Sequence, residues 1–140
     1  MPPAQPVLPP NVRAFLAEPH YAVMATINRS GTPQLTVMWY ALHPTDDLLL
    51  LNGIGGALKV KNLRRDPRMA LCVEAGYRYV TVEGTAELVT DRTEQQRDVN
   101  EHIAPRYIGQ RLGSRRWDAI QRSDRIGIRL RIHKFHTRGL

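Results

Sequence analysis

Cysteine is almost absent from this chain of 140 residues, and its scarcity excludes one class of small protein. The one cysteine, Cys72, lies in an apolar run and cannot form a disulfide within the chain, so a disulfide-stabilised secreted domain is excluded. Long apolar runs are also missing, because residues 37–42 and 48–51 are far too short to span a membrane. No charged and apolar leader precedes Arg13, so we expect no secretory signal and a cytoplasmic protein.

Acidic residues are in short supply as well. The chain has 13 of them against 20 lysines and arginines, which gives a formal net charge of +7. A basic surface is typical of nucleic-acid-binding proteins, although a small and strongly anionic ligand would use the same field. The arginines are spread along the chain with acids between them, and no basic tail or nucleic-acid motif is present. A nucleic-acid-binding module therefore stays open as an alternative.

Several motifs that carry chemistry are missing too. The glycines of residues 53–56 fit neither the phosphate-binding loop of NTPases nor the GxGxxG pattern of dinucleotide-binding folds. No serine lies in a nucleophile elbow, and no pair of carboxylates stands out. His133 and His136 are three residues apart in a predicted strand, which sends them to opposite faces. We therefore expect no metal site and no catalytic triad.

The most informative stretch that is present is residues 53–68, GIGGALKVKNLRRDPR. Its glycines let the backbone approach a ligand closely, and they lead into a short helix whose first amides are unpaired at the positive end of the helix dipole. Its cations are Lys59, Lys61, Arg64, Arg65 and Arg68, and Asp66 is its one acid. These charges repel one another unless an anion is bound, so we interpret the stretch as a phosphate-binding element. The alternative is an amphipathic helix that buries Leu58, Val60 and Leu63 and leaves its charges in solvent.

Strand patterns occupy most of the remaining chain. Residues 1–10 form a flexible, proline-rich arm, after which Asn11 is expected to cap a short helix that Pro19 ends. Apolar or alternating runs then predict six strands, at residues 21–27, 33–42, 48–51, 68–74, 78–89 and about 126–132. In the second strand, the face that we expect to be core carries Leu35, Val37, Trp39 and Ala41.

The connections between these strands indicate an antiparallel fold. Asp91 or Thr93 is expected to cap a helix to about Ile103, and Ser114 a shorter helix to about Gln121. Gly84, in the middle of a strand, predicts a bulge or a sharp bend. Strands that are adjacent in sequence and joined by hairpins favour a mainly β fold, a six-stranded antiparallel barrel with helical insertions, over a parallel sheet. Residues 11–140 are predicted to form this single domain.

The order of these pieces resembles a known family. The segments ATINRSGTPQLTVMWY, DLLLLN, ALKVKNLRRDPRMALCVE and YVTVEGTAEL are similar to those of the split β-barrel flavin and deazaflavin oxidoreductases, the pyridoxamine-phosphate-oxidase-like superfamily. The resemblance covers residues 11–135 and is strongest to the branch that uses coenzyme F420, an 8-hydroxy-5-deazaflavin. It implies an FMN-binding split-barrel fold and a homodimer with two cofactor sites at the subunit interface.

The resemblance also implies which residues bind the cofactor. Lys59 and Lys61 would contact its phosphate, the strand of residues 33–42 would line its ring system, and two tyrosines would approach from the partner subunit. The expected cofactor-binding residues are Pro33, Gln34, Thr36, Val37, Asn52, Gly53, Lys59, Lys61, Asn62, Tyr77 and Tyr79. Asn52 stands where family members often have Ser or Thr, and Ala57 where some have Arg, so FMN stays open as the alternative cofactor.

The expected activity is hydride transfer between reduced F420 and a small organic substrate with an activated C=C or similar bond. Its proton would come from solvent or from Tyr40, Tyr77 or Tyr79, although each tyrosine is also readily interpreted as a packing or interface residue. Trp39 and Trp117 are interpreted as core or dimer contacts. The alternatives are an FMN-dependent oxidase of pyridoxamine-phosphate-oxidase type, a flavin carrier, and the basic nucleic-acid-binding module.

Overall fold

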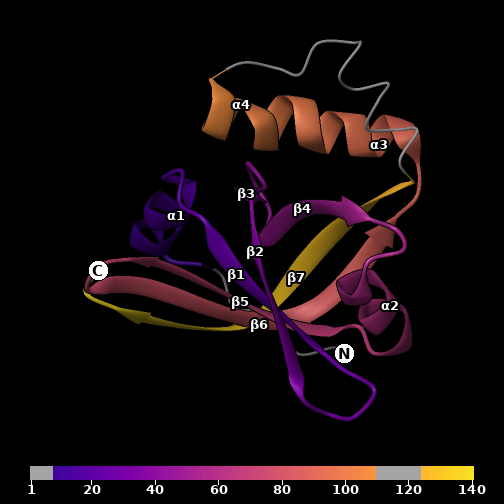
Figure 1. Ribbon diagram of the computed structural model, residues 1–140. Coiled ribbons are helices and arrows are strands. Elements are labelled where there is room, and N and C mark those ends of the chain that lie inside the picture. Colours follow the sequence, from indigo (N-terminus) through magenta and orange to yellow (C-terminus); the bar gives the residue numbers. More distant parts are fainter. Residues whose placement is uncertain (1–7, 110–123) are drawn as a thin grey trace, which may run out of the picture.

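The computed structural model describes residues 8–109 and 124–140. Within them, seven strands form one antiparallel sheet in the order β2-β1-β5-β6-β7-β4-β3. The strands are β1 (Ala22–Ile27), β2 (Pro33–Met38), β3 (Ala41–Leu42), β4 (Leu48–Ile54), β5 (Arg68–Ala75), β6 (Arg78–Val89) and β7 (Arg125–Arg138). The helices are α1 (Pro10–Ala17), α2 (Leu58–Arg65), α3 (Arg92–Arg97) and α4 (Ala104–Ile108). Figure 1 shows the sheet curled on itself, with α2 beside the end of β4.

The predicted second strand is broken at Trp39 and Tyr40, which is why the structure has seven strands and not six. β2 pairs with β1 at one edge of the sheet, whereas β3 pairs with β4 at the opposite edge. The chain crosses between the two edges through these two residues, so the barrel is closed at that end. At the other end, the two edges of the sheet move apart between Pro33, which begins β2, and Ile54, which ends β4. Helix α2 follows β4 at this open end. The predicted class, an antiparallel split β-barrel with helical insertions, is confirmed.

The core fills the inside of the curl and includes the amino-terminal helix. Leu8 is 2% exposed and Phe15 and Leu16 are also buried, so the fold begins before residue 11. The predicted cap at Asn11 is wrong, because the N-cap position is Pro9 and Pro10 is the first helical residue. Proline suits this position since its fixed φ matches the helix and its missing N–H would have no partner there.

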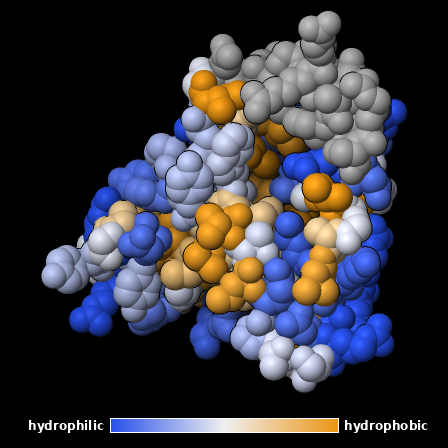
Figure 2. All heavy atoms as spheres, in the orientation of Figure 1, coloured by the Kyte–Doolittle hydropathy of each residue, from blue (hydrophilic) through white to orange (hydrophobic). Residues whose placement is uncertain are grey.

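The face of β2 that was predicted to be core is largely exposed. Leu35 is 64% exposed and Val37 is 66% exposed, whereas Gln34 and Thr36 on the other face are half-buried. The inward side of this edge strand meets polar groups of β1 and α2, so its polar residues point inward. We call the exposed set, which comprises Tyr21, Val23, Leu35, Val37 and Trp39, the apolar hairpin face. Figure 2 shows apolar side chains gathered where β1 and β2 cross the front of the molecule.

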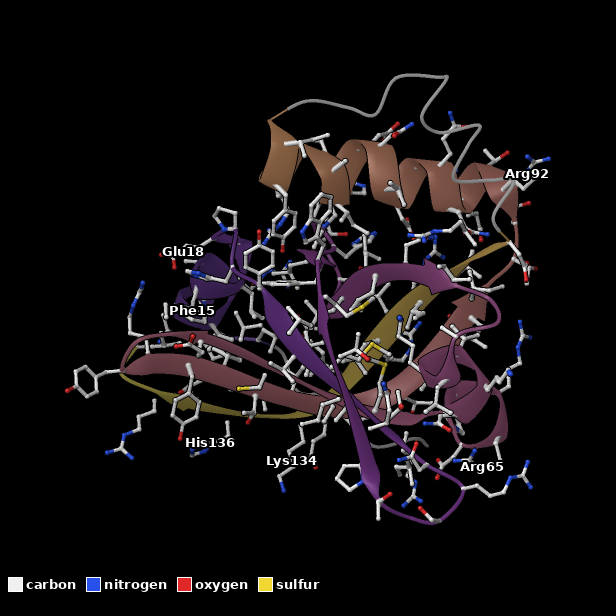
Figure 3. All side chains as sticks on the ribbon, viewed as in Figure 1. Phe15, Glu18, Arg65, Arg92, Lys134 and His136 are labelled. Carbon is white, nitrogen blue, oxygen red and sulfur yellow. The ribbon has the colours of Figure 1, made fainter. Side chains whose placement is uncertain are left out.

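Gly84 marks a bulge, as predicted. The register between β6 and β7 shifts at Glu83/Gly84, and His133 is the extra residue on β7. This insertion reverses the alternation, so the prediction that His133 and His136 lie on opposite faces is wrong: both are exposed on the outer side of the sheet. Figure 3 shows His136 and Lys134 on that side. Among the described residues, no group of three or more His, Cys, Asp or Glu could hold a metal ion.

A helical run longer than predicted lies across β3 and β4. It comprises α3, a π-helical segment (Asp98–Ile103) and α4, and Asp91 caps it by accepting a hydrogen bond from the N–H of Glu94 at 2.8 Å. Its buried side packs on Ala41 and Leu50. The helix predicted from Ser114 to about Gln121, with Trp117, lies outside the described residues. No described helix has the length and apolar character needed to cross a membrane.

Candidate functional site

The open side of the barrel is occupied by α2 and by the glycine turn before it. Gly55 donates its N–H to the carbonyl oxygen of Asp124 at 2.6 Å, and a Cβ at Gly55 would lie 2.6 Å from the Asp124 carboxylate. A larger residue at position 55 would have to displace the Asp124 side chain. The helix then runs from Leu58 to Arg65 and buries Val60 and Leu63 in the core. The predicted element is therefore present, and it is amphipathic as well as basic.

Lys59 is the cation of α2 that turns toward the end of β4. Its side chain is half-buried, and its Cε lies 3.0 Å from where Gly53 would carry a Cβ. Lys61 and Arg64 are exposed, and the exposed Arg65 donates to the carbonyl of Ile27 and to Asn62. The structure thus brings Lys59 against Gly53, whereas the side chain of Asn52 lies on the other face of β4, against Gln95, and Lys61 lies outside this corner.

A second cation, absent from the predicted set, lies on β7 at the same end of β4. Arg125 begins β7 opposite Ile54 of β4, and its Nε donates to the Asn52 Oδ1 at 2.9 Å. Burial and the charge of Arg125 lower the pKa of Lys59, and burial lowers the pKa of Arg125. Neither cation forms an ion pair with any acid in the described part of the chain. Sequence analysis could not identify Arg125, because its position opposite β4 depends on the register between β4 and β7.

A chain of polar side chains connects α2 with β2. Asn62 is 1% exposed, and its Nδ2 donates to Thr26 Oγ1 at 3.1 Å. The Thr26 hydroxyl donates to Gln34 Oε1 at 3.0 Å, and Gln34 Nε2 donates to Thr36 Oγ1 at 2.8 Å. Three of the expected residues are therefore joined through Thr26, which sequence analysis missed. The available signal was a threonine at an inward position of an otherwise apolar strand.

The other expected residues lie elsewhere in the chain. Val37 belongs to the apolar hairpin face, and Pro33 lines a hollow on the outer side of the sheet. Tyr77 is 95% exposed at the tip of the β5–β6 hairpin, and Tyr79 lies against His136 with ring centroids 5.9 Å apart. Within one chain these two tyrosines do not meet Lys59.

One candidate proton donor is a packing residue. Tyr40 is fully buried, and its hydroxyl donates to the carbonyl oxygen of Leu16 at 2.9 Å. Burial raises its pKa well above the usual value. Tyr40 therefore holds α1 against the crossing between β2 and β3 and has no hydroxyl proton to offer a substrate.

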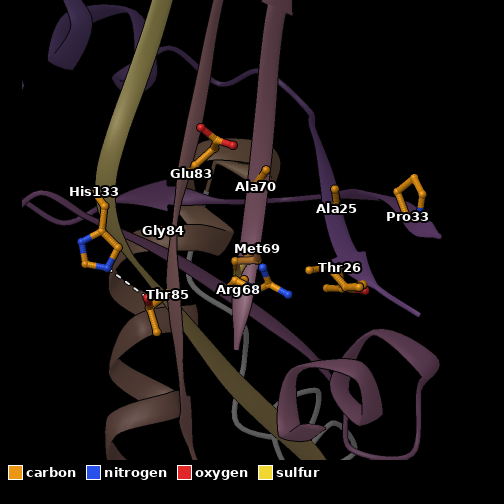
Figure 4. A pocket seen from close by; sticks show the side chains of 11 residues that line it. Ala25, Thr26, Pro33, Arg68, Met69, Ala70, Glu83, Gly84, Thr85 and His133 are labelled. Atoms are coloured by element: carbon orange, nitrogen blue, oxygen red, sulfur yellow. Dashed lines mark hydrogen bonds between the residues drawn. The ribbon is translucent and has the colours of Figure 1, made fainter. Parts of the chain in front are cut away.

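The hollow on the outer side of the sheet has a volume of about 450 Å³. Its polar lining includes Arg68, Glu83, Thr85 and His133, and Figure 4 shows the hydrogen bond of 2.9 Å between Thr85 Oγ1 and His133 Nε2. Ala25 and Ile27 of β1 form its apolar wall, so the hollow continues the apolar hairpin face. Cys72 lies on the same side, in an adjoining hollow, and is half-buried and not a core residue.

A curled antiparallel sheet whose open side holds a basic helix defines a protein of the split β-barrel class. The chain belongs to the pyridoxamine 5′-phosphate oxidase family, whose sequence profile matches residues 8–137. The family predicted from the sequence motifs is thereby confirmed.

Known relatives agree in sequence and in fold. The chain is 28% identical over 103 residues to the F420H₂-dependent biliverdin reductase of Mycobacterium tuberculosis, and the match covers 74% of each protein. A crystal structure of a conserved hypothetical protein from the same organism superimposes with a TM-score of 0.81 and 28% identity, covering 96% of this chain and 89% of that one. An F420 reductase superimposes with a TM-score of 0.73 and 28% identity, covering 92% and 98% of the two chains.

Proposed function

We propose that this protein is an F420-dependent oxidoreductase, which transfers a hydride between the reduced deazaflavin and a small organic substrate with an activated C=C or similar bond. The observation that carries the proposal is the half-buried, unpaired Lys59 at the open side of the barrel. Similarity to two reductases whose names include F420 supports it. The cytoplasmic location predicted from the sequence remains part of the proposal.

The residues at this corner fit a phosphate-bearing coenzyme. An anion placed there would compensate the charge of Lys59, which has no acid partner in the residues described. Gly53 leaves room for the lysine stem, and the linked side chains of Gln34, Thr36 and Asn62 offer polar edges on the same side of the barrel. When bound, F420 supplies the hydride chemistry, and the protein supplies position and charge.

FMN is the alternative cofactor, because it also combines a tricyclic ring with a side chain that ends in a phosphate, and because the family is named for an oxidase. Titration of the purified protein with F420 and with FMN, followed by fluorescence, distinguishes the two. We expect F420 to bind at least about tenfold more tightly, a difference of about 1.4 kcal/mol. Tighter binding of FMN would favour the oxidase or the flavin carrier. Binding of DNA alone, with a steep salt dependence, would favour the nucleic-acid module.

The substrate is tested next, with the purified protein in the presence of reduced F420. Biliverdin is the first compound to assay, because it is the substrate named for the mycobacterial relative. The absorbance of F420 measures its oxidation. We expect this oxidation to require both the protein and the substrate. If F420 binds but biliverdin is not reduced, the substrate is a different compound with a conjugated C=C bond.

We also propose that two copies of the chain associate through the apolar hairpin face, which would let Tyr77 and Tyr79 of one subunit approach the cofactor of the other. Exposed apolar patches of this kind mark protein interfaces. Leu35 and Val37 point away from the core, so a polar residue can replace either of them without entering the interior.

A charge placed on this face should separate the subunits. We expect Val37→Asp to raise the dimer dissociation constant at least about tenfold, because an aspartate would be desolvated in the interface. Analytical ultracentrifugation measures the change, and Ser30→Asp in the exposed β1–β2 turn serves as the control. A Val37→Asp protein as dimeric as the control would place the interface elsewhere.

A further inference from the structure

Helix α2 carries a buried amide at the open end of the barrel. Asn62 is 1% exposed and lies three residues after Lys59, so the two side chains are neighbours on the helix. Its Oδ1 accepts a hydrogen bond from Arg65 at 3.2 Å, and its Nδ2 donates to Thr26 Oγ1 at 3.1 Å and to Asn28 Oδ1 at 3.0 Å. Both hydrogens of this amide are used within the chain, and burial keeps a ligand away from its oxygen. Asn62 therefore supports other side chains, although the sequence placed it among the expected ligands.

Arg65 fixes the direction of the hydrogen bonds that follow. A guanidinium can only donate, so Asn62 turns its oxygen toward Arg65 and its NH₂ group toward Thr26. The Thr26 hydroxyl accepts that bond and has one hydrogen, which it donates to Gln34 Oε1 at 3.0 Å. Gln34 then presents its Nε2 to Thr36 Oγ1 at 2.8 Å. We call this set of hydrogen bonds, from Arg65 through Asn62, Thr26 and Gln34 to Thr36, the polar relay.

The polar relay ends at a hydroxyl whose hydrogen is unused. Thr36 Oγ1 accepts from Gln34, and no further partner of this oxygen lies in residues 8–109 or 124–140. Thr36 pairs with the fully buried Met24 of β1, so its side chain lies on the inward face of the sheet. It is half-buried, and β2 is the last strand of the sheet order, with no strand beyond it. Thr36 therefore offers a hydrogen-bond donor at an unpaired edge of the barrel.

A polar relay in this place has a cost that apolar side chains would avoid. Thr26 is 1% exposed, as Asn62 is, while the core that β1 and α2 share is otherwise apolar, with Met24 and Leu63 buried in it. Replacing both partners of a buried hydrogen bond by apolar groups of the same shape is nearly neutral or stabilising. A use beyond packing therefore lies at an end of the relay that a ligand can reach, and Thr36 is that end.

We propose that Thr36 donates a hydrogen bond to a carbonyl oxygen on the ring of the bound coenzyme. Arg65, Asn62 and Thr26 are positioning residues, which fix the direction of this donor. The inference rests on the proposed function, because the ring belongs to the coenzyme. Helix α2 then serves both ends of the ligand, since Lys59 binds the phosphate and Asn62 supports the donor for the ring. Two residues outside the predicted set, Thr26 and Arg65, join the site.

The main test removes the Thr36 hydroxyl and measures coenzyme affinity. Thr36→Val keeps the shape of the side chain, and we expect it to weaken F420 binding about fivefold in a fluorescence titration, the loss of one neutral hydrogen bond. The absorption spectrum of bound F420 should also differ from that in wild-type protein, because the ring loses a donor. Thr45→Val, in the exposed turn before β4, is the control and should change affinity less than about twofold. Equal affinity and spectrum in wild-type and Thr36→Val protein would overturn the inference.

The positioning role of Thr26 is tested by a double-mutant cycle and by rescue. Thr26→Val should weaken F420 binding about fourfold in the wild-type background and hardly at all in Thr36→Val, because it acts only through Thr36. Thr26→Ser keeps the hydroxyl and should retain the wild-type affinity. Equal losses in both backgrounds, or a loss in Thr26→Ser as large as that in Thr26→Val, would overturn the positioning role.

Arg65 lies on the surface, so its replacement leaves the core intact. Arg65→Met and Arg64→Met remove the same charge from adjacent exposed positions of α2. We expect Arg65→Met to weaken F420 binding about threefold more than Arg64→Met, because only Arg65 holds the Asn62 amide. Equal effects of the two substitutions would remove Arg65 from the relay.

A further readout needs no coenzyme. In the free protein, Thr26→Val should speed the exchange of the Gln34 side-chain amide protons with water, as measured by NMR, because Gln34 Oε1 loses its donor. Thr45→Val should leave this exchange unchanged. Identical exchange rates in the two variants would show that Thr26 does not hold Gln34, and the relay would be refuted.

The outcomes separate the two proposals. Wild-type protein that binds F420, with Thr36→Val as tight as Thr45→Val, overturns this inference and leaves the proposed function intact. Wild-type protein that binds neither F420 nor FMN refutes the proposed function, and the inference with it.

Discussion

Replacing Lys59 with alanine is expected to weaken F420 binding about ten- to a hundredfold. A charge-assisted hydrogen bond contributes about 1.5 to 3 kcal/mol, which corresponds to that range of affinity. Lys59 is half-buried against Gly53, so its charge is less screened by solvent than that of an exposed lysine. Fluorescence titration of F420 against wild-type and Lys59→Ala protein measures the difference.

Lys61 provides the matched control for this experiment. It lies two residues further along α2 and carries the same charge, but it is exposed on the other side of the helix. We expect Lys61→Ala to weaken F420 binding less than about threefold, since screening by water and salt leaves an exposed charge little effect. Equal titration curves for wild-type and Lys59→Ala protein would remove Lys59 from the site, and a larger loss in Lys61→Ala would reverse the roles of the two lysines.

Replacing Gly84 with alanine is expected to destabilise the fold by at least about 3 kcal/mol. An added Cβ would lie 1.9 Å from the carbonyl oxygen of Arg131 and 2.9 Å from its carbonyl carbon. Both atoms are backbone in the neighbouring strand, so the collision cannot be relieved by a side-chain rotation. The β6–β7 pairing would have to open at the bulge, at the point where His133 is inserted.

Urea unfolding at a fixed protein concentration measures this free energy. Gly56→Ala is the control, because a Cβ there meets no atom within 4 Å and the backbone of Gly56 has no positive φ. That substitution should be neutral or stabilising by a few tenths of a kcal/mol, as the unfolded chain loses freedom. A Gly84→Ala protein as stable as Gly56→Ala would mean that the sheet accommodates a side chain at the bulge.

Most of the strands and the cationic helix could be predicted from the sequence because each is encoded locally. The alternation from Tyr79 to Leu88 predicted β6, and the glycine turn with the following Lys59 predicted α2. Asp91 was identified as a helix cap by its residue type and position alone. These features depend on neighbours within a few residues, where periodicity and capping chemistry apply.

Other features depended on partners far away in the chain. The polarity of β2 was inverted, because periodicity separates two faces without telling which one meets the core. His133 and His136 share a face only because β7 has an extra residue at the bulge opposite Gly84, where the absence of a side chain lets Arg131 approach. The break at Trp39 and Tyr40 arises because the two halves of one apolar run pair with different edges of the sheet.

The amino-acid sequence by itself determined the split-barrel family, the basic helix after the glycines and the expectation of a phosphate-bearing redox coenzyme. Tertiary structure alone decided where these cations point. Lys59 turns toward Gly53 while Lys61 is exposed, and Arg125 donates to Asn52 from 73 residues further along the chain. The physical reason is strand register: the pairing of β4 with β7 sets Arg125 beside Asn52, and no pattern within either strand encodes that neighbour.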